Sequence, residues 1–204
     1  MIMWPLKTLR DNGIEDITIV STPDGVGQIA KVLGSGHEHG CRFTYRVQDQ
    51  PGGIAQALAC AWTHLADDTA AVILGDNIFL SKVVIRGAGS QARTYLARVP
   101  DLSGFGVPAF HSMGDHINAV FEKPLNPPSE FAITGLYVFG TSLWEILHTV
   151  RPSNRGELEI TDVLHDYAQR ECLSHTIVDG FWGDAGTLEG MAECSEACRK
   201  ELQK

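Results

Sequence analysis

Short apolar segments rich in β-branched residues alternate with helical segments through the first part of this chain. We expect strands at residues 14–21, 42–48 and 70–74, and helices at residues 2–12, 28–33 and 54–66. Because each helix carries the chain back across a face of a growing sheet, this alternation favours layered α/β folds. The sequence therefore predicts an α/β protein with a mixed, mostly parallel sheet and helices on both of its faces.

The rest of the chain has a looser pattern, with short strands at close intervals that are expected to pair partly antiparallel. The expected strands are residues 93–99, 106–111, 117–121, 131–139 and 173–178. The expected helices are a short one within residues 81–91, then 143–150, 160–170 and 187–202, the last capped by Thr187. Thr22-Pro23-Asp24-Gly25 has turn chemistry. No repeat or linker interrupts the pattern, which indicates a single domain.

The composition of the chain excludes some classes of partner, nucleic acid and membrane among them. Its formal net charge is −9 at pH 7, and such a surface repels the nucleic-acid backbone. The apolar runs are too short to span a bilayer, and the first residues lack the pattern of a signal peptide. We therefore expect a cytoplasmic protein that binds neither nucleic acid nor membrane. Its 5 scattered cysteines favour free thiols over a disulfide framework.

An acidic residue follows the apolar segment at residues 70–74. Leu74-Gly75-Asp76-Asn77 ends that expected strand, and ligands of open α/β sheets bind just beyond the carboxyl ends of strands. Trp182-Gly183-Asp184-Ala185-Gly186 again places an aspartate beside a glycine after an apolar or aromatic segment. Two carboxylates brought together in this way bind one Mg²⁺ and leave positions open for phosphate oxygens. The spacing alone leaves a simpler alternative open, in which Asp76 and Asp184 are turn or cap residues.

A lysine follows another expected strand, in Glu122-Lys123-Pro124. Pro124 ends the strand, which leaves Lys123 at the edge of the sheet as a point charge suited to a phosphate. A solvated Glu–Lys pair at a strand end accounts for the same residues. Pro51-Gly52-Gly53 precedes an expected helix, where a glycine lets a ligand approach the backbone closely, although an ordinary loop has the same composition.

Taken in order, these segments resemble the sugar-1-phosphate nucleotidylyltransferases, and most closely the glucose-1-phosphate thymidylyltransferases among them. The resemblance covers nearly the whole chain, and Gly156-Glu157-Leu158-Glu159-Ile160-Thr161-Asp162 is a specific signature of that family. Supporting motifs are Leu74-Gly75-Asp76-Asn77, Glu122-Lys123-Pro124, Thr134-Gly135-Leu136-Tyr137 and Trp182-Gly183-Asp184-Ala185-Gly186. The resemblance implies a Rossmann-like layered fold of the nucleotide-diphospho-sugar transferase type.

The resemblance also implies roles for individual residues. Asp76 and Asp184 match the Mg²⁺-binding aspartates, and Lys123 matches the lysine that grips the sugar phosphate; these three form the implied catalytic set. Gln48 and Gly53 match the part of the family that reads a thymine or uracil base. The residues matched to the sugar pocket and to the segment that closes over it are Gly106, Glu122, Ile133, Tyr137, Arg155 and Glu157.

The implied reaction transfers a nucleotidyl group from dTTP to glucose 1-phosphate and yields dTDP-glucose and pyrophosphate. The implied partners are these small molecules, with Mg²⁺ as cofactor. The sugar phosphate oxygen attacks the α-phosphorus in line, so that positioning two anions and neutralising their charge supply most of the catalysis. An exposed strand edge further predicts a homo-oligomer.

One family feature has no counterpart in the sequence. The family begins with a strand and a loop of the form G-G-x-G-T-R-L that cradles the triphosphate, whereas Met1-Ile2-x-x-Pro5-Leu6 matches a later segment. We therefore expect a single nucleotidyltransferase-like domain at residues 1–204, truncated at its N-terminus relative to the family, with the first strand missing and with impaired activity. Three explanations stay open: a fragment or mis-called start of a working enzyme, a short chain completed by a partner, and a non-catalytic relative that binds sugar phosphates or nucleotide sugars.

Overall fold

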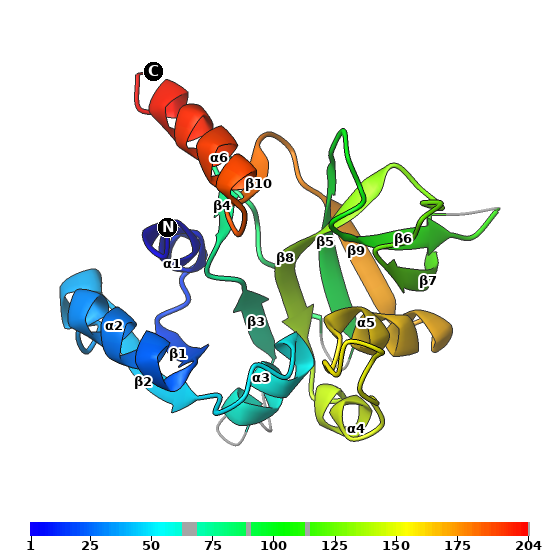
Figure 1. Cartoon of the computed structure of the whole chain (residues 1–204), viewed down its shortest axis with the longest axis horizontal. Helices are drawn as coiled ribbons and strands as arrows, with labels where there is room; N and C mark the ends of the chain where they lie inside the picture. Colours follow the sequence, from blue (N-terminus) through cyan, green and yellow to red (C-terminus); the bar gives the residue numbers. More distant parts are fainter. Residues whose placement is uncertain (63–68, 89–90, 113–114, 204) are drawn as a thin grey trace.

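A computed structural model describes residues 1–62, 69–88, 91–112 and 115–203, and its helices and strands form a layered α/β arrangement (Figure 1). The elements of the first part are α1 (Met3–Asp11), β1 (Asp16–Ser21), α2 (Pro23–Leu33), the 3₁₀ helix η1 (His37–His39), β2 (Arg42–Val47), α3 (Ile54–Trp62) and β3 (Ala70–Ile73). Those of the second part are β4 (Asn77–Phe79), β5 (Ala92–Arg98), β6 (Gly106–Phe110), β7 (Ile117–Glu122), β8 (Phe131–Phe139), α4 (Leu143–Leu147), α5 (Ile160–Gln169), β9 (Leu173–Ile177), β10 (Trp182–Asp184) and α6 (Leu188–Glu201). The mixed α/β class expected from the sequence is confirmed.

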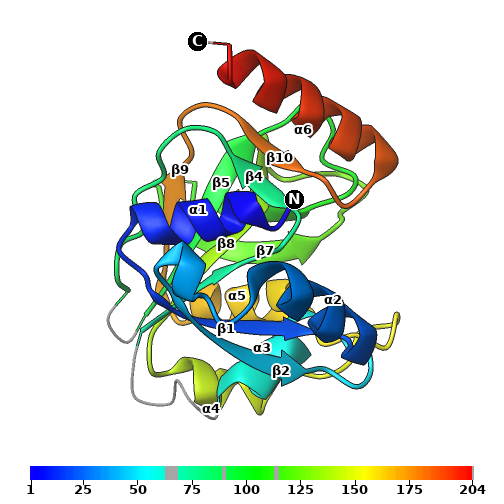
Figure 2. The same ribbon diagram turned by 90° about the vertical axis from the view of Figure 1, so that its left-hand side faces the viewer.

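The parallel pair β1–β2 forms a small sheet of its own, with Asp16 opposite Arg42. α2 packs on one face of this pair and α3 on the other (Figure 2). Ile17 and Ile19 of β1 contribute to a local apolar core that they share with α1 and α2. The strand and helix alternation predicted for these residues is therefore confirmed.

The main sheet has the strand order β3-β8-β5-β9, and β8 is buried along its whole length. Ile133, Tyr137 and Phe139 of β8 lie in the larger apolar core together with residues of α3, α4 and α5, which Figure 1 shows side by side below the sheet. Leu136 and Val138 lie in a second core with residues of β4 and β10. Because successive side chains of β8 enter two cores, its sequence is mostly apolar along both faces instead of alternating.

Antiparallel pairs are more common in the described residues than the sequence predicts. β1–β2 and β5–β9 are parallel, whereas β3–β8, β5–β8, β4–β10 and β6–β7 are antiparallel. The expectation of a mostly parallel sheet is wrong for these pairs. The reason is that β8 runs opposite to both of its neighbours, while β6 and β7 are joined by a connection too short for a parallel crossover.

The segment Thr22-Pro23-Asp24-Gly25 begins α2 and does not form the expected turn. Thr22 has an extended backbone, and its hydroxyl oxygen accepts a hydrogen bond from Gly25 N at 3.2 Å. Pro23 occupies the first helical position, where the N–H that it lacks would be unpaired in any case. The residue types that favour turns thus act here as a helix cap, so that α2 starts before the expected residue 28.

The short helix expected within residues 81–91 is absent from the described part of that segment. Ile85 N donates to Asn12 Oδ1 at 2.8 Å, and Arg86 N donates to the Tyr95 hydroxyl at 3.3 Å. The Tyr95 hydroxyl in turn donates to Val84 O at 3.1 Å. Side chains distant in the sequence therefore satisfy the backbone groups that a helix would pair internally.

The remaining predicted elements are present with small shifts at their ends, apart from residues 63–66 of the third expected helix, which lie outside the described residues. Thr187 caps α6 as expected, since its hydroxyl oxygen accepts from Gly190 N at 3.0 Å. All five cysteines are free thiols. In the part of the chain that the structure describes, no helix has the length and apolar character needed to cross a bilayer.

Candidate active site

Asp76 and Asp184 lie next to each other, at the start of β4 and the end of β10. The two strands pair antiparallel with Asp184 opposite Asn77, and Ala185 N donates to Asp76 O at 2.9 Å. A Cβ atom built on Gly186 would lie 3.0 Å from both Asp184 Oδ1 and Asp76 Oδ2. Asp184 Oδ1 and Asp76 Oδ2 are therefore near neighbours, because both lie 3.0 Å from the same point. Since Gly186 has no side chain, there is room beside these two oxygens.

The surroundings of Asp184 show which charges share this region. Burial raises the pKa of Asp184 above its usual value, and the neighbouring carboxylate of Asp76 raises it further. The Gly186 N–H, which donates to Asp184 Oδ1 at 2.8 Å, and the Lys123 ammonium group both lower that pKa. Lys123 is thus close enough to interact electrostatically with the carboxylate pair.

The two aspartates fit a hard divalent cation. Mg²⁺ is commonly held by one or two carboxylates and takes its other ligands from water and substrate phosphates. Among the described residues, no group of three or more His, Cys, Asp or Glu side chains is arranged to hold a metal ion. A cation between Asp76 and Asp184 would therefore have an open coordination sphere, as a catalytic site requires and a structural site does not.

Asn77 connects three of the sequence motifs. Its side chain is buried, with Oδ1 accepting from Gly135 N at 2.8 Å and from Trp182 Nε1 at 2.7 Å. Its Nδ2 donates to Asp76 Oδ1 at 3.0 Å. The sequence predicts no separate role for Asn77 or Trp182, although an amide directly after an acidic residue is a visible signal.

Lys123 and Glu122 form the second group of charges, at the end of β7. Lys123 has a left-handed backbone with φ 43°, and its N–H donates to Phe105 O at 3.1 Å. Lys123 Nζ lies 3.6 Å from Glu122 Oε1, and Arg155 Nη2 lies 3.0 Å from the same oxygen. The structure therefore brings Lys123, expected to grip the sugar phosphate, and Arg155, expected on the segment that closes over the sugar pocket, to a single carboxylate.

Glu159 anchors Arg155 and was not found from the sequence. Its buried carboxylate accepts from Arg155 Nη2 at 2.9 Å with each oxygen, and from Ser153 Oγ at 2.7 Å. Glu157, which the sequence analysis did single out, lies at 3.7 Å from Arg155 Nη2 and is more exposed. The spacing of four residues between Arg155 and Glu159 is the signal that was available.

Gly106 and Ile133 lie beside these charges. Gly106 is paired with Glu122 across the β6–β7 ladder. A Cβ atom on Gly106 would lie 2.7 Å from Thr161 Cγ2 and 3.7 Å from Ile133 Cδ1. Thr161 Oγ1 in turn donates to Glu122 Oε2 at 3.1 Å. The residues expected to line a sugar pocket are thus neighbours in space.

Tyr137 lies between the two groups of charges. Its side chain is buried, and burial raises its pKa, with further contributions from Glu122, Asp184 and Asp76 in that order. The carboxylates of Glu122, Asp184 and Asp76 are therefore all close enough to interact electrostatically with this one buried side chain.

Gln48 and Gly53 form a separate group on the loop between β2 and α3. Gln48 Nε2 donates to Gly53 O at 3.1 Å and to Gln56 Oε1 at 2.7 Å. Gly53 has a φ of 94°, and a Cβ atom on it would lie 2.4 Å from Leu158 O. The glycine therefore makes room for the backbone next to Glu157 and Glu159, which links this loop to the Arg155 segment.

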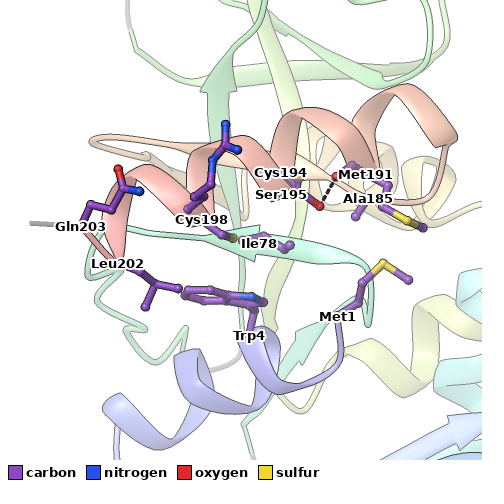
Figure 3. Close-up of a pocket in the computed structure, with 11 residues that line it drawn as sticks. Met1, Trp4, Ile78, Ala185, Met191, Cys194, Ser195, Cys198, Leu202 and Gln203 are labelled. Carbon is purple, nitrogen blue, oxygen red and sulfur yellow. Dashed lines mark hydrogen bonds between the residues drawn. The ribbon is translucent and has the colours of Figure 1, made fainter.

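A cavity of about 470 Å³ lies between α1 and α6 (Figure 3). Ile78 and Ala185 form part of its wall, while Cys194 and Cys198 face it from α6. None of the described residues that line it is Asp or Glu. Burial raises the pKa of Cys194 to about 11, so this thiol is protonated at neutral pH and is not a nucleophile.

The class of protein follows from a comparison of the whole chain with known families. The sequence model of the nucleotidyl transferase family matches residues 1–201 of this chain. This chain belongs to the nucleotidyl transferase family, as its motifs indicate.

Two curated relatives give a narrower likeness. Glucose-1-phosphate thymidylyltransferase of Actinoplanes sp. is 37% identical over 205 residues, which cover 97% of this chain and 66% of the relative. Glucose-1-phosphate thymidylyltransferase of Mycobacterium tuberculosis (strain H37Rv) is 32% identical over 210 residues, which cover 98% of this chain and 71% of the relative. The chain thus spans about two thirds of the length of these relatives.

Solved structures agree with this likeness. A crystal structure from Bacillus anthracis, provisionally assigned as a glucose-1-phosphate thymidylyltransferase and in complex with sucrose, superposes with a TM-score of 0.88 at 36% identity. The match covers 97% of this chain and 82% of that one. UDP-glucose pyrophosphorylase complexed with UDP-glucose superposes with a TM-score of 0.81 at 23% identity, covering 98% of this chain and 86% of that one, and at this identity it supports the fold alone.

Proposed function

We propose that this protein transfers a nucleotidyl group from dTTP to glucose 1-phosphate, releasing pyrophosphate, with Mg²⁺ as cofactor. The observation that carries the proposal is the convergence of Asp76 and Asp184 near Lys123 in a single site. The choice of substrates rests on the names of relatives at 37% and 32% identity.

Lys123 and Arg155 supply the positive charge that a sugar phosphate needs in a chain of net charge −9. Both cations lie close to Glu122 Oε1, at 3.6 Å from Lys123 Nζ and 3.0 Å from Arg155 Nη2. We propose that the phosphate takes the place of this carboxylate as their partner, and that Glu122 then accepts a hydrogen bond from a sugar hydroxyl. Arg155 stays oriented through this exchange because Glu159 holds it from the buried side.

The chemistry requires little from acid–base catalysis. An oxygen of the sugar phosphate forms a bond to the α-phosphorus, and the bond from that phosphorus to the pyrophosphate oxygen breaks. A bound Mg²⁺ would neutralise charge on the triphosphate and on the leaving pyrophosphate. Asp76 and Asp184 would hold it, while Lys123 and Arg155 hold the attacking phosphate in line. Gln48 and Gly53 are proposed to face the pyrimidine base.

The test is pyrophosphate release from dTTP and glucose 1-phosphate, with UTP, CTP and ATP as alternative donors. Asp76→Asn and Asp184→Asn keep the shape of the site and remove its charge, so each should abolish release while leaving the melting temperature close to that of the unchanged protein. Because impaired activity is expected of residues 1–204, the assay is also run on a version extended at the N-terminus, and no release by either version with any donor contradicts the proposal. Calorimetric binding of glucose 1-phosphate or dTDP-glucose in that case would instead identify a non-catalytic relative.

A further inference from the structure

The buried amide of Asn77 has a defined orientation. Asn77 is 1% exposed, and its Oδ1 faces two groups that only donate, Gly135 N at 2.8 Å and Trp182 Nε1 at 2.7 Å. Oxygen and nitrogen of an amide are distinguished by such partners. The oxygen must therefore face these two donors, and the NH₂ group must face Asp76.

This orientation selects between the two carboxylate oxygens of Asp76. Nδ2 of Asn77 donates to Oδ1 at 3.0 Å. The other oxygen, Oδ2, is the one that lies 3.0 Å from the Cβ position of Gly186, on the side of Asp184. The hydrogen bond thus holds one oxygen and leaves the other directed into the space between the two aspartates.

We propose that Asn77 is a positioning residue for the divalent cation, because it fixes the rotation of the Asp76 carboxylate. The inference rests on the proposed function, since it requires that Asp76 and Asp184 hold a cation. Hydrogen bonds to metal-binding side chains generally orient those ligands, and removing such a bond lowers metal affinity by about 10–100-fold. Gly135 N of β8 and Trp182 Nε1 of β10 both donate to Asn77 Oδ1, so either bond alone keeps the NH₂ group directed at Asp76.

The space around Asn77 supports this assignment. A Cβ atom on Gly135 would lie 2.7 Å from the side-chain atoms Cγ, Oδ1 and Nδ2 of Asn77. A methyl group there displaces the amide without removing it. Gly135→Ala is therefore a second way to disturb the hydrogen bond to Asp76, and it leaves the Asn77 residue itself unsubstituted.

The experiment measures binding of Mn²⁺ by electron paramagnetic resonance in the full chain, with thermal unfolding recorded in parallel. Asn77→Leu keeps the approximate volume of the side chain and removes the Nδ2 donor. Gly135→Ala keeps the donor but displaces the amide group of Asn77. Both should weaken Mn²⁺ binding by about tenfold or more. Trp182→Phe is the matched control, because it removes a bond to Asn77 but leaves the Gly135 N–H and the donation to Asp76 in place; its Mn²⁺ affinity should stay near that of the unchanged protein.

The outcomes separate the inference from the function on which it rests. If the unchanged protein binds no Mn²⁺, with or without dTTP, the proposed cation site fails. If it binds Mn²⁺ and both variants bind equally well while only their melting temperatures fall, Asn77 is merely structural and the inference is overturned. Should Asn77→Leu not fold, the affinity of Gly135→Ala decides the question alone.

Discussion

The carboxylates of Asp76 and Asp184 face the same glycine, since an oxygen of each lies 3.0 Å from the Cβ position of Gly186. The ladder between β4 and β10 creates this relationship by placing Asp184 opposite Asn77. The backbone N–H of Gly186 also donates to Asp184 Oδ1 at 2.8 Å. Gly186 therefore contacts Asp184 directly, and its lack of a side chain leaves space next to both carboxylates.

Gly186→Ala should abolish divalent cation binding with little loss of stability. The added methyl group would press on both carboxylates, and no left-handed φ restricts the backbone at this position. Mn²⁺ titration followed by electron paramagnetic resonance checks the prediction. Gly27→Ala is the control, because a Cβ atom on this glycine of α2 meets nothing within 4 Å. Unaltered Mn²⁺ affinity in Gly186→Ala would contradict a cation position between the aspartates.

Lys123→Ala should weaken binding of glucose 1-phosphate by about 10–100-fold, because a hydrogen bond to a charged group contributes about 1.5–3 kcal/mol. Binding of glucose itself should change little, since it carries no phosphate. Isothermal titration calorimetry with both ligands measures the difference. Lys31→Ala, at an exposed position of α2, alters net charge equally and should leave both affinities unchanged. An equal loss for phosphate and neutral sugar would remove the assigned role of Lys123.

Arg155→Met should lower the free energy of unfolding by about 1–3 kcal/mol, because it leaves the buried carboxylate of Glu159 without its cation. The side chain of Glu159 is 9% exposed, whereas that of Arg155 is 45% exposed, which limits the effect. Arg42→Met is the matched control: Asp16, the partner of Arg42, is exposed, so the expected loss is much smaller than for Arg155→Met. Urea unfolding measures both values, and equal losses would argue against an anchoring role of Glu159.

The sequence predicts most helices and strands here, since their apolar patterns are local. It fails where distant groups decide the local structure. Residues 81–88 pair their backbone with Asn12 and Tyr95 instead of forming a helix, and no local pattern contains that information. Thr22 and Pro23 have residue types that serve both turns and helix starts, so the sequence does not distinguish the two outcomes.

The residues of the candidate site also divide into those that local sequence reveals and those that only the folded chain reveals. Asp76 and Lys123 stand out because each ends an apolar segment, but their proximity depends on how β7, β8 and β10 are placed in three dimensions. The spacing left the pairing of Asp76 with Asp184 open beside turn or cap roles, and the resemblance to a family favoured the pairing. Asn77 and Glu159 were missed because their roles consist of contacts with other site residues, which become visible only in the folded chain.

Lowering the pH should destabilise the protein partly through His175. Burial lowers the pKa of His175 from its ordinary value of 6.5; Asp115 opposes this shift, while Arg93 and His116 add to it. Between the lowered pKa and 6.5 the unfolded chain binds more protons than the folded one, so the free energy of unfolding rises with pH in this window. The contribution is present above 6.5 and is lost as the pH falls through the window. His175→Gln should therefore flatten the loss of stability between about pH 7 and pH 5, measured by urea unfolding. An unchanged slope in His175→Gln would show that this histidine does not titrate with folding.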